Sequence, residues 1–263
     1  LDFFFTCQEL ANLYWNKVRG SAGFNEGDFG GPLEIWKLNG DEIIFTCRVE
    51  FDKVEQYIWI LLCLSKKMAE DLREKFDKSE RFDFKFCVWS AGFPINNHEM
   101  YLGEGQNPDF AGSAPPQFDV MNLVGLAEKR ARREEIPARM LDFIGPSMDL
   151  GFRLRDYASR RMLILSADLA SRYFSMTTEN NESRGYINEE IGVDLDRKAL
   201  RFLTLQDIKG VTSVKRYPIF FIDIETNDDL KKIADEEDKV MYGNRENTDF
   251  SAYFRAFLDN KNP

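Results

Sequence analysis

Two short segments contain most of the side chains that could do chemistry. The first, residues 36–42, places Lys37 and Asp41 on either side of Leu38-Asn39-Gly40, and Asn-Gly is turn chemistry. The apolar and β-branched runs on both sides predict two strands, so Asp41 is expected at the tip of a hairpin. A carboxylate in that place is a suitable ligand for a hard cation such as Mg²⁺ or Mn²⁺.

The second segment, residues 142–153, predicts the end of a strand, a Gly-Pro turn and then a helix. Asp149 and Arg153 are four positions apart in this helix and therefore share one face. Such an arginine can stabilise charge on a phosphoryl group during its transfer, and a helical salt bridge to Asp149 is the structural alternative. A carboxylate tip and an Asp/Arg helix are useful together when the ligand is a metal-bound triphosphate.

Both segments resemble the signature of the class III nucleotidyl cyclases, the family of adenylate and guanylate cyclase catalytic domains. That family has a Lys-x-x-Gly-Asp hairpin and an Asp-x-x-Gly-x-x-x-Asn-x-x-x-Arg turn and helix. The matching residues here are Lys37, Gly40 and Asp41 in the hairpin and Asp142, Gly145 and Arg153 in the turn and helix. Residues 207–219 resemble the family's closing Lys-Gly hairpin, whose lysine is Lys209 here. The resemblance covers residues 33–223.

The resemblance implies an α+β fold, a ferredoxin-like βαββαβ sandwich in which helices cover one face of a mostly antiparallel sheet. We therefore expect a cyclase domain over residues 1–225, with an insertion at about 94–140, and a C-terminal extension over 226–263. Hydrophobic periodicity predicts helices at residues 6–18, 54–76 and 168–174, and strands at 33–38, 43–49, 81–90, 162–166, 200–205 and 219–224. Residues 177–185 are expected to be a polar loop.

The resemblance also implies how the base and ribose are bound. Lys37 and Asp142 occupy the positions that, in adenine-specific members, donate to ring N1 and accept from the exocyclic amine. Cytosine also offers an acceptor and an amine, so CTP is an alternative to ATP. The family's ribose-binding Asn is replaced by Asp149, which can accept a hydrogen bond from a ribose hydroxyl but cannot donate like an amide.

The phosphates and metal ions complete the implied site. Cyclisation requires attack of the ribose 3′-oxygen on the α-phosphorus while pyrophosphate leaves, and two metal ions about 3.5–4 Å apart can assist both oxygens. Asp41 is one expected ligand of Mg²⁺ or Mn²⁺, and the second is Asp2 or a residue that precedes it in the protein. Arg153 is expected to stabilise the transferring phosphoryl group, and Lys209 to bind the terminal phosphates.

The expected function is therefore that of a nucleotidyl cyclase that converts ATP to a 3′,5′-cyclic nucleotide and pyrophosphate. In this family the metal carboxylates and the helix arginine come from different subunits, so the resemblance implies a homodimer with shared sites. One alternative is a pyrimidine cyclase of anti-phage signalling, which uses CTP or UTP. Another is a cyclase-fold scaffold without turnover, which binds nucleotide or a partner domain.

Composition argues against several other classes of function. The formal net charge of −10 argues against general binding of nucleic acid, which would need a basic surface. A single histidine, His98, makes a multi-histidine zinc site improbable. The four cysteines form no Cys-x-x-Cys pair and are interpreted as buried apolar thiols in a reducing cytosol. With no apolar run of 18 residues and no signal peptide, we expect a cytoplasmic protein without a membrane partner.

Overall fold

Segments that are distant in the sequence combine into two units. Unit 1 consists of Leu1–Gly30, Val49–Ser90 and Leu150–Pro263, and unit 2 of Gly31–Arg48 and Ala91–Asp149. The computed structural model describes residues 2–20, 33–49, 51–76, 84–94, 96–101, 136, 138–176, 182–193, 195, 199–208, 216–225, 227–242 and 250–261. Within these residues the protein is a mixed α/β structure with mainly antiparallel strands.

Unit 1 contains a four-stranded sheet in the order β3-β6-β8-β7. Its strands are β3 (Cys87–Val88), β6 (Met162–Leu165), β7 (Leu200–Gln206) and β8 (Tyr217–Asp223). β6 is parallel to β3 and antiparallel to β8, which is also antiparallel to β7. β8 is buried from Tyr217 to Ile222, and its almost continuous apolar sequence is typical of a strand that is covered on both faces.

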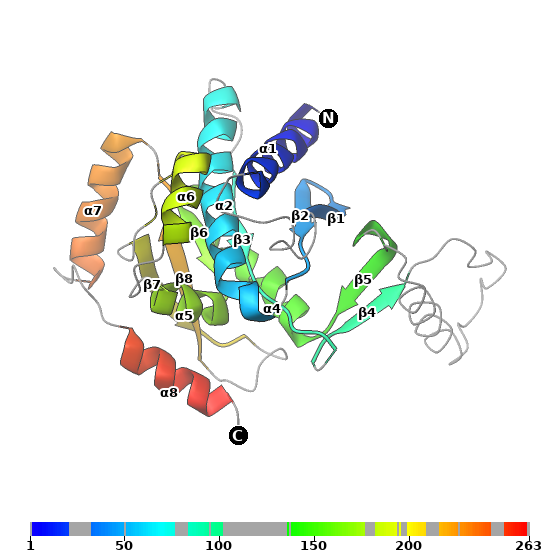
Figure 1. The fold of residues 1–263 in the computed structure, drawn as a ribbon. Coiled ribbons are helices and arrows are strands. Elements are labelled where there is room, and N and C mark those ends of the chain that lie inside the picture. Colours follow the sequence, from blue (N-terminus) through cyan, green and yellow to red (C-terminus); the bar gives the residue numbers. More distant parts are fainter. Residues whose placement is uncertain are drawn as a thin grey trace. The chain divides into compact units, whose positions relative to one another are not determined.

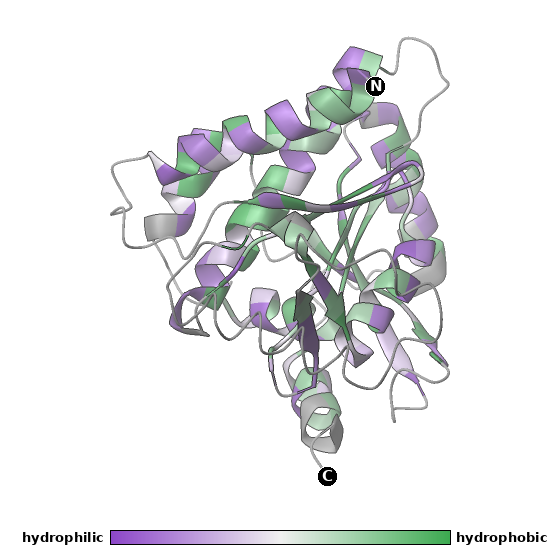
Figure 2. Cartoon of the chain, turned by 90° about the vertical axis from the view of Figure 1, so that its right-hand side faces the viewer, coloured by the Kyte–Doolittle hydropathy of each residue, from purple (hydrophilic) through white to green (hydrophobic). Residues whose placement is uncertain are grey.

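The described part of unit 1 also contains helices. They are α1 (Asp2–Arg19), α2 (Val54–Phe76), α5 (Ala167–Met176), α6 (Glu182–Ile191), α7 (Asp228–Tyr242) and α8 (Ser251–Lys261), with short 3₁₀ turns η2 (Phe51–Lys53) and η5 (Arg155–Tyr157). α1, α2 and α6 pack against one another, while α5 contacts α2, β8 and α8 (Figure 1). Figure 2 shows hydrophobic and hydrophilic residues alternating along the helices.

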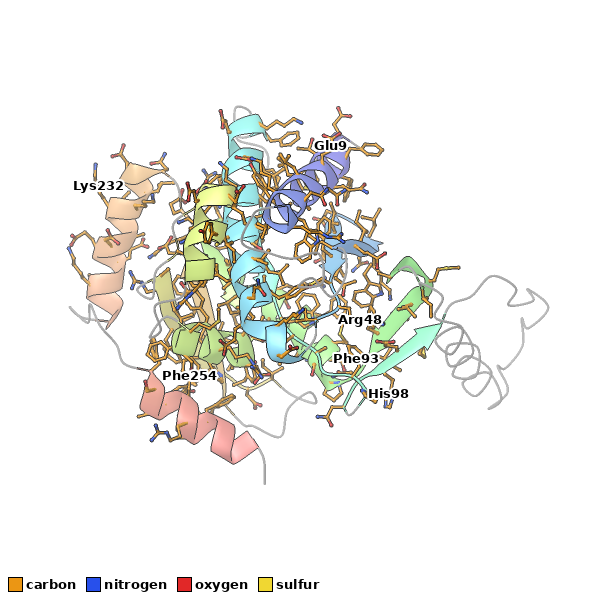
Figure 3. The ribbon with its side chains drawn as sticks, in the orientation of Figure 1. Glu9, Arg48, Phe93, His98, Lys232 and Phe254 are labelled. Atoms are coloured by element: carbon orange, nitrogen blue, oxygen red, sulfur yellow. The ribbon has the colours of Figure 1, made fainter. Side chains whose placement is uncertain are left out.

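Two anchors fix helices to this sheet. The buried guanidinium of Arg73 in α2 donates to the carbonyl oxygen of Ile224, 2.7 Å away, and to that of Arg160. Both carbonyls lie just outside sheet strands, so Arg73 satisfies backbone groups that no strand partner reaches. On α8, the ring of Phe254 packs against Phe220 of β8 with centroids 4.8 Å apart (Figure 3).

The described residues of unit 2 form two separate two-stranded antiparallel sheets. The first is the hairpin of β1 (Glu34–Asn39) and β2 (Glu42–Thr46), and the second pairs β4 (His98–Tyr101) with β5 (Leu141–Ile144). A 3₁₀ turn, η4 (Ala138–Met140), precedes β5, and α4 (Pro146–Leu154) follows it. α4 begins in unit 2 and ends in unit 1.

Several local predictions are confirmed, and others are wrong. The helix at 54–76 has the predicted bounds, and the strands at 162–166, 200–205 and 219–224 are found within two residues. The polar loop predicted at 177–185 is wrong in its second part, because α6 begins at residue 182. α1 begins at Asp2 and not near residue 6, so Asp2 lies in the first helical turn.

The predicted α+β class is confirmed only at the level of a mixed α/β structure with antiparallel strands. Instead of one sheet, the described strands form three, and the β3–β6 pair is parallel. The ferredoxin-like βαββαβ arrangement and the domain bounds 1–225 and 226–263 stay predictions. β4 lies inside the predicted insertion at 94–140, most of which falls outside the described residues. No helix in the described part has the length and apolar content to cross a membrane.

Candidate functional site

The β1–β2 hairpin places Asp41 at its tip, as the sequence predicts. Asn39 pairs with Glu42, so Gly40 and Asp41 form a two-residue loop, and the Asn39 amide donates to the Glu42 carboxylate at 3.2 Å. The φ of Gly40 is 65°, a conformation that costs glycine little and other residues more. The Asp41 side chain is exposed, and among the described residues it has no hydrogen-bond or ion-pair partner. Its carboxylate is therefore open to a cation.

Lys37 and Asp142, which are 105 positions apart, form an ion pair within unit 2. Lys37 Nζ lies 2.5 Å from Asp142 Oδ1, and this oxygen also accepts the backbone N–H of Phe143 at 2.9 Å. Within the described part of the chain, Asp142 Oδ2 has no partner. The side chains of Lys37 and Asp142 are 38% and 24% exposed. A ligand could therefore reach an ammonium donor and a carboxylate acceptor that lie side by side.

A buried asparagine, Asn97, holds the turn between β5 and α4. Its Nδ2 donates to the Gly92 carbonyl oxygen at 2.8 Å and to Ser147 Oγ at 3.2 Å, and its Oδ1 accepts the Ser147 N–H at 3.1 Å. The last bond satisfies one of the N–H groups that a helix N-terminus leaves open. Phe93 and His98, labelled in Figure 3, flank this loop, and His98 pairs with Ile144 of β5. Sequence reasoning missed Asn97 because nothing in its polar surroundings distinguishes it from a surface residue.

The turn between β5 and α4 also requires a glycine at position 145, and a substitution there tests how tightly the turn is packed. The φ of Gly145 is 139°, and a Cβ there would lie 2.6 Å from Asn97 Oδ1 and 2.7 Å from the Asn96 carbonyl oxygen. We expect Gly145→Ala to lower the free energy of unfolding by about 3 kcal/mol, from backbone strain and overpacking together. Denaturant unfolding measures this loss.

Gly92 is the matched control in the same unit, because a Cβ at Gly92 meets nothing within 4 Å. Gly92→Ala should change the free energy of unfolding by no more than about 0.5 kcal/mol. Equal losses in the two variants would contradict the proposed tightness of the turn.

Asp149 and Arg153 are both exposed on α4. The N–H of Asp149 donates to the Gly145 carbonyl at 3.0 Å, so Asp149 stands in the first turn, and Arg153 stands in the last. Both charges suit the helix dipole, which is a structural reason for their presence. The alternative of a salt bridge between them is not found among the described residues. Asp149 belongs to unit 2 and Arg153 to unit 1.

The two remaining predicted residues are placed differently. Asp2 is exposed in the first turn of α1 in unit 1, and not at the end of a strand as the family pattern would have it. Lys209 lies outside the described residues. Of the two predicted metal ligands, only Asp41 lies in unit 2, where Lys37 and Asp142 also lie.

The described residues contain no group of three or more His, Cys, Asp or Glu side chains that could hold a metal ion on their own. Mg²⁺ is commonly bound by one or two carboxylates together with substrate phosphates and water, and not by a cage of protein ligands. The open carboxylate of Asp41 fits the first of these modes.

Three of the four cysteines offer no activated nucleophile. All four are free thiols, and burial raises the pKa of Cys7, Cys47 and Cys87 to about 12. These three thiols are therefore protonated at neutral pH, whereas a reactive cysteine needs the thiolate.

Comparison with protein-family models, with curated proteins and with solved structures finds no match to this chain.

Proposed function

We propose that this protein is a nucleotidyl cyclase with a cyclase-type ferredoxin-like core, which converts ATP to a 3′,5′-cyclic nucleotide and pyrophosphate. The contact between Lys37 and Asp142 supports this proposal most strongly. Because they are 105 residues apart in the sequence, nothing local predicts a contact between them. The cyclase motif does predict one, since both side chains are expected to bind the same nucleotide base. The exposed carboxylate of Asp41 lies in the same unit.

The Lys37–Asp142 pair matches the edge of an aminated base. Adenine presents ring N1, an acceptor, beside an exocyclic amine, a donor. The Lys37 ammonium can donate one hydrogen bond to the ring nitrogen and keep its hydrogen bond to Asp142 Oδ1. Asp142 Oδ2 can then accept a hydrogen bond from the exocyclic amine. Cytosine presents the same acceptor and amine, so the observed pair also supports CTP as the second candidate, in a pyrimidine cyclase of anti-phage signalling.

Asp41 would hold Mg²⁺ or Mn²⁺ together with the phosphates of the nucleotide. When bound, such ions activate the attacking oxygen and neutralise the leaving one. Because Asp41 is on a two-residue loop fixed by Gly40 and by the Asn39–Glu42 hydrogen bond, its backbone position is well defined. The backbone that carries this carboxylate therefore loses little freedom when the substrate binds.

The two charged residues of α4 would act on the sugar and the phosphates. Asp149 can accept a hydrogen bond from a ribose hydroxyl and so orient the sugar. Arg153, which makes no ion pair with Asp149, can donate to the phosphoryl group as charge develops on it. Lys209 would bind the terminal phosphates. We further propose a homodimer in which Asp41 of one subunit acts with Arg153 of the other.

Incubation of the full-length protein with each of the four ribonucleoside triphosphates and Mn²⁺, with products resolved by mass, tests the function. A cyclic adenosine product supports the proposal, and a cyclic cytidine or uridine product supports the pyrimidine cyclase. Binding of a triphosphate without any cyclic product would indicate the scaffold alternative and contradict both enzymes.

A further inference from the structure

Trp36 is the extra residue of a β-bulge in strand β1. Ile35 lies opposite Phe45, but Lys37 lies opposite Ile44, so two steps along β1 correspond to one step along β2. In a regular strand, neighbouring side chains such as those of Trp36 and Lys37 point to opposite faces. A bulge changes this direction and can re-aim a side chain.

Both residues reach strand β5. The buried indole N–H of Trp36 donates to the Leu141 carbonyl oxygen at 2.9 Å, and its ring contacts Phe143 with centroids 5.0 Å apart. Lys37 reaches Asp142 between these two residues. Two consecutive residues of β1 thus contact three consecutive residues of β5.

The described strands β1 and β5 belong to different sheets, and no ladder of backbone hydrogen bonds joins them. Side chains must therefore set the register between Lys37 and Asp142. Trp36 acts on both: its indole bonds the backbone beside Asp142, and the Lys37 ammonium lies over its ring, 4.6 Å from the centroid. This cation–π contact limits the directions in which the flexible lysine can point.

We propose that Trp36 is a positioning residue for base recognition, which holds the Lys37 ammonium and the Asp142 carboxylate side by side in the register that a base edge needs. This inference rests on the proposed nucleotidyl cyclase function. Trp36 touches no substrate in this scheme and acts through Lys37 and Asp142 alone.

The first test measures how often Lys37 and Asp142 are in contact and does not depend on catalysis. A carbodiimide joins a lysine amine directly to a carboxylate in contact with it, and mass spectrometry of the digested protein detects the Lys37–Asp142 linkage. Trp36→Phe keeps an aromatic ring but removes the indole N–H, so we expect the yield of this linkage to fall about fivefold or more, as one net hydrogen bond is lost.

Trp59→Phe is the matched control. Trp59 is equally buried, and its indole N–H also makes one 2.9 Å bond, to Asn188 Oδ1, but Trp59 lies in unit 1, whereas Lys37 and Asp142 lie in unit 2. Its linkage yield should equal that of the wild type. Equal yields in Trp36→Phe and the wild type would overturn the proposal.

The second test measures discrimination between bases. In Trp36→Phe we expect KM for the preferred triphosphate to rise about tenfold with kcat nearly unchanged, and the preference over the other three to narrow by a similar factor. A purely structural role would reduce the rates with all four triphosphates equally, and that result overturns the proposal. If the wild type neither binds nor converts any triphosphate, the proposed function fails and base recognition with it, while the linkage yields still decide whether Trp36 sets the register.

Discussion

In the proposed cyclase, replacement of Asp41 by asparagine should lower turnover by about 10³-fold, because the proposed metal ligand is lost and with it several kcal/mol of transition-state stabilisation. The change is nearly isosteric and removes only the charge. Asp41 is exposed and has no partner among the described residues, so no internal contact is broken. The initial rate of cyclic product formation at saturating triphosphate and Mn²⁺ measures the effect.

Two controls make this result specific to Asp41. Asp52→Asn removes the charge of another exposed aspartate, in η2, and should leave turnover unchanged. The free energy of unfolding of Asp41→Asn should stay within about 0.5 kcal/mol of the wild type, as for other surface substitutions. Wild-type turnover in Asp41→Asn would exclude this carboxylate from the chemistry.

The hairpin could be predicted because its signals are local. Asn39 and Gly40 supply the turn, and the positive φ observed at Gly40 is the reason that a glycine is found there. The helix at 54–76 could be predicted for the same reason, since its apolar residues follow a near-helical repeat. The hairpin and this helix are both determined by residues close together in the chain, so their signals can be recognised in the sequence.

The contact of Lys37 with Asp142 depends on different information. Composition and spacing do not relate two residues 105 positions apart, and the expectation came from the family motif alone. Asn97 had no motif, so its bonds to Gly92 and Ser147 could not be foreseen. A buried amide is recognisable only when the backbone groups that it satisfies are brought to it.

Tertiary packing also overrides local preference in α6. Gly185 and the polar residues near it favour a loop, yet the helix begins at residue 182. Ile187 and Ile191 are buried, and Asn188 Oδ1 accepts the indole N–H of Trp59 from α2. These contacts stabilise a helix that is weak by propensity, which is the usual origin of helix stability in proteins.

In the proposed cyclase, replacement of Arg153 by alanine should lower kcat by about 10²–10³-fold, with a smaller effect on triphosphate binding, because its proposed role is to donate hydrogen bonds to the charge that develops in the transition state. Arg255→Ala is the control, since Arg255 is an equally exposed arginine on α8. It should leave kcat unchanged. An unaltered kcat in Arg153→Ala would mean that the match of α4 to the cyclase motif is coincidental.

Mixing the two inactive variants tests how the sites are assembled. If Asp41 and Arg153 act from opposite subunits, a heterodimer of Asp41→Asn and Arg153→Ala contains one intact site and one site with both defects. Random exchange makes half of the dimers heterodimers, each with one of its two sites intact, so turnover should recover to roughly a quarter of the wild-type value. Native mass spectrometry verifies the exchange. Verified heterodimers without recovered turnover, beside an active wild type, would show that Asp41 and Arg153 serve the same site from a single chain, because every site in the mixture would then lack one of them.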